Sequence, residues 1–455
     1  MAVGLKLLGL VTSRLKFPLW FIILTDSIPG PSAPTMPSLH PPDRYPESLP
    51  WIPNLPWSRL LLGLSLLLAG CQTPFPRALE PLQPLEAAPS PSPTSTTLHL
   101  LTWEGYAPPA LVERFERETG IDVEVTYARS AEDLANHLQA GSLGTSPGTS
   151  DLPAYDLATP LGSDLQVTQT QGSLYQPLDL AQIPHRWGIL PPLAIKSRQF
   201  TQDPAPPAPG AAPLQYGIPA AWGTLGLVVQ GDPMAPGAGD PPDSFQDLCV
   251  GNWPDGVLWP AQFPALMVAA YAQGRDPFGL MVKQPQNRQG WEELLQQSYG
   301  YLEQCQGNVA GLWQDPDEVA DALYDGKVMA AVAWDHTGWL LQRLNPKVRF
   351  VVPQEGALGW FSVFALPAQA DNRAAAYAWI NFMYQPAIAA AFMEESGLLS
   401  PLRSAQAYLS PAQQQTFGSL YGVGVVSRVH WFPPRSPQWD ALAQPYTVRW
   451  QRLIP

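Results

Sequence analysis

Three residues with side chains suited to holding a ligand, Trp103, Glu104 and Tyr106, follow an apolar run of strand length. Two prolines after Tyr106 suit a helix start, and apolar residues then recur at helical spacing as far as Gly120. Residues 121–125 alternate apolar and polar, which indicates a second strand. The order strand, helix, strand predicts a right-handed crossover and a parallel sheet. Ligands bind beyond the carboxyl ends of such strands, so we expect the three residues at a ligand site.

Further aromatic residues occur at comparable positions. Trp222 lies in an apolar, glycine-rich stretch at 216–229, which is typical of a strand that crosses between two lobes. Trp334 ends the buried strand expected at 328–334, and Trp360 opens another apolar run. Each of these rings could be core filling, as most of the 17 tryptophans must be. As a set at strand ends, they favour a cleft lined by aromatic faces that holds an aliphatic or cationic ligand.

Patterns for covalent chemistry are missing from the sequence. It has no nucleophile elbow, no phosphate-binding glycine loop, and no Cys or His pair at metal-ligand spacing. The six histidines are scattered, and only His336, beside Trp334 and Asp335, is near a candidate site. A hydrogen-bonded structural role is the simpler explanation for that histidine. We therefore predict no catalytic residue, no cofactor and no metal.

The length of 455 residues exceeds what one hydrophobic core usually serves, so two lobes are expected. A stretch rich in Pro, Ala and Gly at 200–213 predicts a surface loop. Apolar periodicity also predicts a short strand at 155–159, a strand at 359–367, and helices at 131–140, 265–273, 290–305, 316–326, 374–383 and 386–395.

The segment before Cys71 has the layout of a secretory signal, with a basic residue, a leucine-rich run and small residues. Residues 68–71 resemble a bacterial lipobox, which implies that residues 1–70 are removed and that Cys71 is lipidated. A short buried helix is the alternative. The leader is unusually long and rich in proline, and a true translation start at Met36 or elsewhere would account for it. Residues 71–97, rich in Pro, Ser and Thr, predict a flexible tether.

The protein is acidic, with a formal net charge of −13 that becomes −15 once residues 1–70 and their five basic and three acidic side chains are removed. Such a protein is a poor partner for nucleic acid and a reasonable one for cations. Besides Cys71 the chain has Cys249 and Cys305, which could form a disulfide or remain two buried thiols. An enzyme with one of these two as nucleophile is a further alternative, and it requires an exposed thiolate beside a base.

The run Trp103 to Pro109, followed by the run Phe115 to Ile121, resembles the start of the spermidine/putrescine-binding periplasmic proteins of ABC importers. The resemblance covers roughly residues 98–408. It implies an α/β fold, a two-lobed periplasmic binding protein of type 2. Each lobe would be a mostly parallel sheet flanked by helices, with two hinge crossings and closure around the ligand. Further matches follow in the same order at 155–157, 218–226, 326–334, 355–360 and 380–386.

On this resemblance, lobe 1 comprises residues 98–224 and 359–407, and lobe 2 comprises residues 225–358 and 408–455. Together with the lipobox at Cys71 and the missing catalytic motifs, the resemblance leads us to expect a periplasmic, lipid-anchored monomer without enzymatic activity. Its partners would be a small-molecule ligand, an amine or a polyamine-like compound, and an inner-membrane ABC permease. A periplasmic sensor or assembly lipoprotein on the same fold is an alternative. A ferric-iron carrier would need adjacent tyrosines, and the sequence has no Tyr-Tyr doublet.

Trp103, Tyr106, Trp334 and Trp360 match the aromatic residues that line the polyamine channel in this family. The family's acidic residues are not preserved: residues 259–264 contain no carboxylate, and Ser362 stands at the position of an aspartate.

Burying several ammonium groups without carboxylates costs several kcal/mol for each charge. We therefore expect an amine of lower charge, with Glu104 and Asp335 as replacement partners, or a ligand held mainly by aromatic and backbone contacts. That both acids are solvated loop charges stays open. The candidate ligand-binding set is Trp103, Glu104, Tyr106, Trp222, Trp334, Asp335, Trp360 and Ser362.

Overall fold

The computed structural model describes residues 97–143, 154–165, 174–203, 212–231, 242–251, 253, 255–434 and 436–454. Residues 1–84 and 85–455 form two units, and every described residue belongs to the second. The predicted leader, the lipidation site at Cys71 and the tether up to residue 96 lie outside the described residues.

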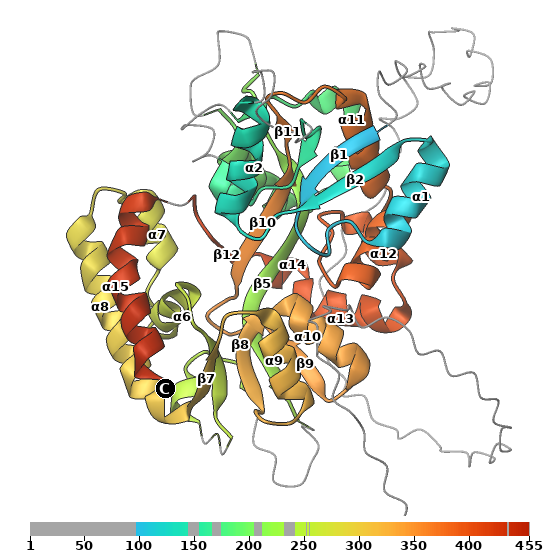
Figure 1. The fold of residues 1–455 in the computed structure, drawn as a ribbon. Coiled ribbons are helices and arrows are strands. Elements are labelled where there is room, and N and C mark those ends of the chain that lie inside the picture. Colours follow the sequence, from blue (N-terminus) through green and yellow to red (C-terminus); the bar gives the residue numbers. More distant parts are fainter. Residues whose placement is uncertain are drawn as a thin grey trace, which may run out of the picture. The chain divides into compact units, whose positions relative to one another are not determined.

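The first sheet contains the strand-helix-strand unit that the sequence predicts. Strand β1 (Thr97–Thr102) pairs in parallel with β2 (Asp122–Tyr127) and with β3 (Leu157–Ala158). Helix α1 (Pro109–Thr119) starts on the second proline and ends at Gly120, whose φ of 71° is left-handed and suits glycine. The predicted order strand, helix, strand and the parallel pairing of the two strands are therefore confirmed (Figure 1).

The second sheet is built around β5 (Ile218–Gln230), which is antiparallel to each of its three neighbours. These neighbours are β10 (Leu358–Phe364), β8 (Ala330–Trp334) and β9 (Val348–Val351). Figure 1 shows β5 and β10 running side by side. Parallel pairs extend the sheet on both sides through β6 (Val257–Pro260), β7 (Val309–Trp313) and β12 (His430–Trp431), giving the order β12-β10-β5-β8-β6-β7.

Strand β5 links two hydrophobic cores. Its residues from Ile218 to Trp222 belong to the first core, together with buried residues of β1, α1 and β3. From Leu225 onward it belongs to the second core, together with β6 and β8. The 13-residue strand is buried almost throughout, which explains its continuous apolar sequence. The crossing strand predicted at 216–229 is thus confirmed as a strand that enters both cores.

The predicted helices are confirmed within a few residues of their expected ends, and several further helices were not predicted. Helix α10 starts directly at the end of β8, so no loop marks its start. Helix α4 overlaps the predicted loop at 200–213, because its last residues precede the proline-rich part, and residues 204–211 of that loop lie outside the described residues.

The predicted helices correspond to α2 (Ala131–Leu143), α6 (Pro264–Ala272), α8 (Arg288–Cys305), α9 (Pro316–Tyr324), α11 (Arg373–Met383) and α12 (Pro386–Ser396). The others are α4 (Pro191–Thr201), α5 (Asp247–Val250), α7 (Pro277–Lys283), α10 (Asp335–Leu344), α13 (Pro411–Tyr421), α14 (Val423–Val426) and α15 (Pro437–Leu453). Short elements complete the described chain: β4 (Tyr175–Gln176), β11 (Leu366–Pro367), and 3-10 helices η2 (Leu180–Gln182), η3 (Pro184–Gly188), η4 (Gln306–Asn308) and η5 (Arg403–Tyr408).

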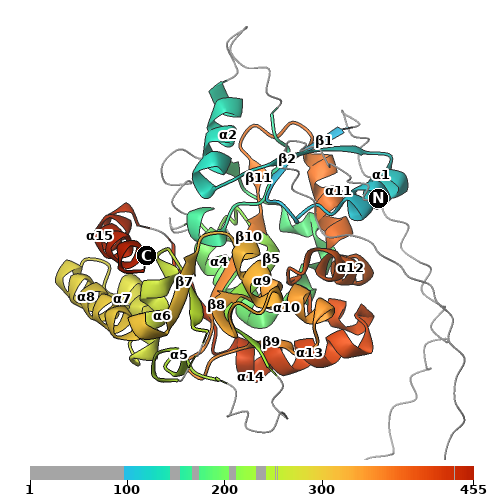
Figure 2. The ribbon, with the colours of Figure 1, turned by 60° about the horizontal axis from the view of Figure 1, so that its bottom comes forward.

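The C-terminal segment contributes to both cores. Tyr421 and Trp431 are buried in the first core, whereas Trp439 and Trp450 are buried in the second. Helix α15 lies along α8 in both views (Figures 1 and 2), and the Trp291 and Trp439 rings are 6.0 Å apart. The lobe boundaries predicted from the sequence remain a proposal, and this division favours placing the part before α15 with the first core.

Cys249 and Cys305 form a disulfide that joins α5 to the last residue of α8. Of the two alternatives open from the sequence, the structure has the bridge. No helix in the described part of the chain is both long enough and apolar enough to cross a bilayer.

Candidate functional site

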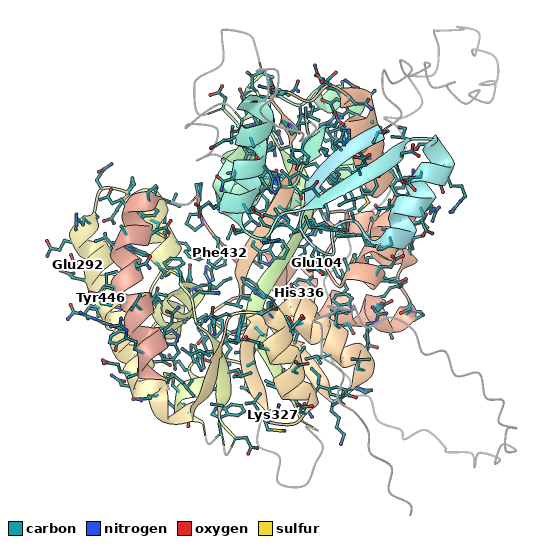
Figure 3. All side chains as sticks on the ribbon, in the orientation of Figure 1. Glu104, Glu292, Lys327, His336, Phe432 and Tyr446 are labelled. Carbon is teal, nitrogen blue, oxygen red and sulfur yellow. A yellow bond between two sulfur atoms is a disulfide. The ribbon has the colours of Figure 1, made fainter. Side chains whose placement is uncertain are left out.

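The loop after β1 carries three of the predicted residues. The Trp103 indole N–H donates to the carbonyl oxygen of Thr159 at 2.6 Å, which fixes this half-buried ring at the end of β3. The backbone N–H of Tyr106 closes a turn on the carbonyl of Trp103 at 3.2 Å, and Gly105 within it has a left-handed φ of 84°. Glu104 is exposed at this turn (Figure 3). The turn therefore holds two rings on the protein and leaves a carboxylate in solvent.

Tyr106 joins this loop to β10. Its hydroxyl forms a hydrogen bond with the Ser362 hydroxyl, and its ring packs edge-on against Phe392 at a centroid distance of 6.4 Å. Burial raises the pKa of Tyr106 well above its ordinary value, and the bond to Ser362 lowers it only partly. The tyrosine is thus neutral at physiological pH. Ser362 is fully buried, with its hydroxyl 3.4 Å from the carbonyl oxygen of Ala221.

Two tryptophans meet across β5. The rings of Trp334, at the end of β8, and Trp360, in β10, are perpendicular, with centroids 6.5 Å apart. Their partners on β5 are Leu225 and Gly223, two residues apart, so both rings lie on the same face of the sheet. Ser362 follows Trp360 at the same two-residue spacing and shares this face. Trp334, Trp360, Ser362 and Tyr106 therefore form one connected group drawn from three separate stretches of the chain.

Gly223 lies under this group. A Cβ atom at this position would be 2.8 Å from Asp335 Oδ1 and 2.8 Å from Trp360 Cζ2. Both distances are shorter than real Cβ contacts. The carboxylate of Asp335 and the Trp360 ring thus sit together over the glycine, in space that any side chain would occupy.

Asp335 is buried, with 3% of its surface exposed, and both of its oxygens accept hydrogen bonds. Oδ2 accepts from the Thr224 N–H at 2.7 Å, from the Thr224 hydroxyl at 3.1 Å and from the Tyr421 hydroxyl. Oδ1 accepts from the N–H of His336 at 2.8 Å. Burial raises the pKa of Asp335 to about 6, and the hydrogen bonds, that of Tyr421 first, oppose the rise. As the first residue of α10, the carboxylate is also favoured by the helix dipole.

Trp222 is placed apart from this group. It is 1% exposed, and its indole N–H donates to the carbonyl oxygen of Ser400 at 3.1 Å. Its ring packs on Tyr421 and Trp431, with centroids at 5.0 and 5.9 Å. Neighbouring residues on a strand point to opposite faces, so Trp222 and Gly223 face opposite ways. The structure therefore brings together the other sheet aromatics but not Trp222.

His336 is partly buried and follows Asp335 in the first turn of α10 (Figure 3). Its Nδ1 has no hydrogen-bond partner among the described residues, and burial lowers its pKa to about 4. The histidine is therefore neutral at pH 7. The described residues contain no group of three or more His, Cys, Asp or Glu side chains that could hold a metal ion.

Sequence reasoning missed three residues of this arrangement: Gly223, Thr224 and Tyr421. Gly223 and Thr224 lie within the crossing strand, where the apolar pattern gave no reason to single them out. Tyr421 is 86 residues from Asp335, at the end of a helix that was not predicted. No local pattern in the sequence identifies it.

A parallel sheet with candidate residues beyond its first strand, joined to a second core by strands β5 and β10, defines an α/β protein with two lobes. The chain belongs to the family of bacterial extracellular solute-binding proteins, whose sequence profile matches residues 110–416. The sequence resemblance to spermidine/putrescine-binding periplasmic proteins and the two-lobed α/β fold class are thereby confirmed.

Relatives named for polyamine binding resemble this chain over most of its length. It is 25% identical over 320 residues to the spermidine/putrescine-binding periplasmic protein of Escherichia coli (strain K12), covering 70% of this chain and 81% of the relative. It is 27% identical over 307 residues to the putrescine-binding periplasmic protein PotF of the same organism, covering 65% and 75%. The spermidine/putrescine ABC transporter substrate-binding protein PotD of Streptococcus pneumoniae has the same fold, with a TM-score of 0.64 and 22% identity, over 79% of this chain and 99% of that one.

Membership of this family makes the chain a solute-binding protein and not an enzyme. The alternative of a cysteine nucleophile also loses its reactive group, because Cys249 and Cys305 are bonded to each other. The prediction of a non-enzymatic protein is therefore confirmed by the family.

Proposed function

We propose that this protein is the substrate-binding component of an ABC importer and captures an amine of low charge between its two lobes. The observation that carries the proposal is the connected group of Trp334, Trp360, Ser362 and Tyr106, with the Asp335 carboxylate beside the Trp360 ring. Relatives named as spermidine/putrescine-binding and putrescine-binding proteins support an amine as the ligand. The name of the structural neighbour from Streptococcus pneumoniae supports an ABC permease as the partner.

Aromatic rings suit the two parts of an alkylamine. The half-buried faces of Trp103, Tyr106, Trp334 and Trp360 would cover the methylene chain and attract the ammonium group, a contact worth about 0.5–2 kcal/mol per ring. The Ser362 and Tyr106 hydroxyls already bond to each other and bring no charge. Binding would draw the lobes together around the ligand, with the sheet strands β5 and β10 as the crossings.

Charge limits the ligand. In the candidate set the carboxylates are Asp335, which is buried, and Glu104, which is exposed. One buried carboxylate compensates one ammonium group of the ligand. A second ammonium group would be paired only with an acid in solvent, and a third ammonium group would be buried without a partner. We therefore propose a monoamine, or a diamine whose second ammonium group lies at Glu104. Trp222, buried on the other face of β5, would act on the ligand only by supporting the strand.

The location follows the family. The names of the relatives support a periplasmic protein. Lipidation at Cys71, a tether that ends near residue 97, and a monomeric state are parts of the same proposal. Two lobes hinged at β5 and β10 would then present the bound amine to the inner-membrane permease.

Isothermal titration calorimetry with n-butylamine, putrescine and spermidine tests the proposal. We expect one site, with n-butylamine or putrescine bound more tightly than spermidine. Trp360→Ala should weaken binding by at least tenfold, because it removes both a ring face and the contact with Trp334. Trp187→Ala is the matched control, since this tryptophan is 81% exposed on η3 and should leave affinity unchanged. Heats indistinguishable from dilution for all three amines would refute the proposal.

A further inference from the structure

Tyr421 and Thr224 hold one face of the buried carboxylate of Asp335 and leave the other face toward Trp360. We propose that these two residues are positioning residues for the cationic group of the ligand: they fix Asp335 Oδ2, so that Oδ1 receives the ammonium group beside Trp360. The inference rests on the proposed capture of an amine. It adds two residues that touch no ligand themselves.

The two oxygens of Asp335 are unequally occupied. Oδ2 accepts three hydrogen bonds, from the N–H and hydroxyl of Thr224 and from the hydroxyl of Tyr421. Oδ1 accepts one, from the His336 N–H. The three donors to Oδ2 share its two lone pairs, whereas Oδ1 uses one of its two and keeps the other for a further donor. That oxygen is the one that lies with Trp360 Cζ2 over Gly223.

Tyr421 is held rigidly. Its ring packs on Trp222 and Phe417, with centroids at 5.0 and 5.5 Å, and its hydroxyl also lies 3.3 Å from that of Thr224. Thr224 is fixed by its place in β5. The carboxylate is therefore anchored by β5 and α13, two elements separate from β8 and α10, where Asp335 itself lies. Rotation of Oδ1 away from Trp360 would break all three bonds to Oδ2.

The carboxylate has no cationic partner in the described protein. No lysine, arginine or histidine among the described residues forms an ion pair with Asp335. The titratable residues bonded to it are Tyr421, through its hydroxyl, and His336, through its backbone N–H. Both side chains are neutral at pH 7, since burial raises the pKa of Tyr421 and lowers that of His336. A buried carboxylate held by neutral donors and set beside an aromatic ring is suited to a cation that arrives with the ligand.

Replacing Tyr421 by phenylalanine tests this role. The variant loses a hydrogen bond that stabilises the charged form of Asp335, so the pKa of that carboxyl should rise above about 6. We expect Tyr421→Phe to bind n-butylamine about tenfold more weakly at pH 7, with the loss shrinking at pH 8.5. Tyr384→Phe is the matched control, because that fully buried tyrosine donates to the carbonyl of Pro219 on the same strand and touches no carboxylate. It should keep the wild-type pH profile.

Two further variants keep the test decisive if Tyr421→Phe does not fold. Thr224→Val removes one donor to Oδ2 and keeps the backbone N–H, so it should shift the pH profile in the same direction by a smaller amount. When Thr224→Val is added to an Asp335→Asn variant, the affinity for n-butylamine should equal that of Asp335→Asn alone. Wild-type binding of the amine combined with parallel pH profiles for Tyr421→Phe and Tyr384→Phe would overturn the inference and leave the proposed function standing. Absence of amine binding by the wild-type protein would overturn both.

Discussion

Gly223→Ala is the most direct perturbation of the candidate site, because it adds a single carbon between Asp335 and Trp360. The new Cβ would lie 2.8 Å from Asp335 Oδ1 and 2.8 Å from Trp360 Cζ2, and 3.0 Å from a second ring atom, Cε2. Ordinary contacts begin at 3.4 Å, so the carboxylate and the ring must each retreat by 0.6 Å, the difference from 2.8 Å. The hydrogen bonds of Asp335 and the packing of Trp360 on Trp334 resist that movement.

Overpacking of this kind costs about 1–3 kcal/mol, which corresponds to a fall in melting temperature of roughly 1–4 °C for a protein of this size. Because the atoms displaced are those proposed to meet the ligand, amine affinity should fall by about tenfold or more, or about 1.4 kcal/mol. The measurements are thermal unfolding by circular dichroism and calorimetric titration with n-butylamine.

Gly300→Ala serves as the control. Gly300 lies inside α8, and a Cβ there would meet nothing within 4 Å. Alanine should stabilise the helix by about 0.5–1 kcal/mol and leave binding unchanged. If Gly223→Ala melted and bound amine like the wild type, Asp335 and Trp360 would not be held over the glycine, and the geometric reasoning for the site would fail.

Three further outcomes follow from the structure. The folded-state pKa of Asp335 is raised from 3.8 to about 6, so its contribution to stability is present below about pH 4 and is lost as pH rises through 6, a loss of about 3 kcal/mol. An amine that supplies the counter-charge should therefore raise the melting temperature more at pH 7.5 than at pH 5, and an equal rise at both pH values would contradict the role given to Asp335. Replacing both Cys249 and Cys305 by serine opens a link between residues 56 apart in sequence and should cost about 4 kcal/mol of unfolding free energy, measured by urea denaturation. Cys71→Ser should move the protein from the membrane fraction to the soluble periplasmic fraction on immunoblots of fractionated cells, and unchanged membrane association would exclude lipidation at this residue.

Local patterns in the sequence predicted the elements that depend on neighbouring residues. The alternation at 121–125, the proline that starts α1 and the left-handed Gly120 that ends it are features of a few consecutive residues. The apolar run of β5 likewise indicated a buried strand, because burial on both faces needs no polar position. Helix α10 escaped prediction because it follows β8 without a loop.

The geometry of the site could not be predicted in this way, because it depends on which face of a strand each residue takes. Trp222 and Gly223 are neighbours in an apolar run, yet pairing with β10 sends the tryptophan into the first core and leaves the glycine under Trp360. Because side chains alternate along a strand, Trp222 and Gly223 must point to opposite faces. Only the pairing of strands in the sheet decides which of the two faces the ligand. A sequence with an unbroken apolar run carries no mark of the choice.

The sequence by itself determined the family, the first crossover and the positions of the aromatic residues at strand ends. Only the tertiary structure decided the disulfide, the contact between Trp334 and Trp360, and the bonds of Asp335 to Thr224 and Tyr421, which are 111 and 86 residues away. The physical reason is that a charge buried without a counter-charge is stabilised by whichever donors the fold brings to it. Those donors come from separate elements whose spacing along the chain is unconstrained.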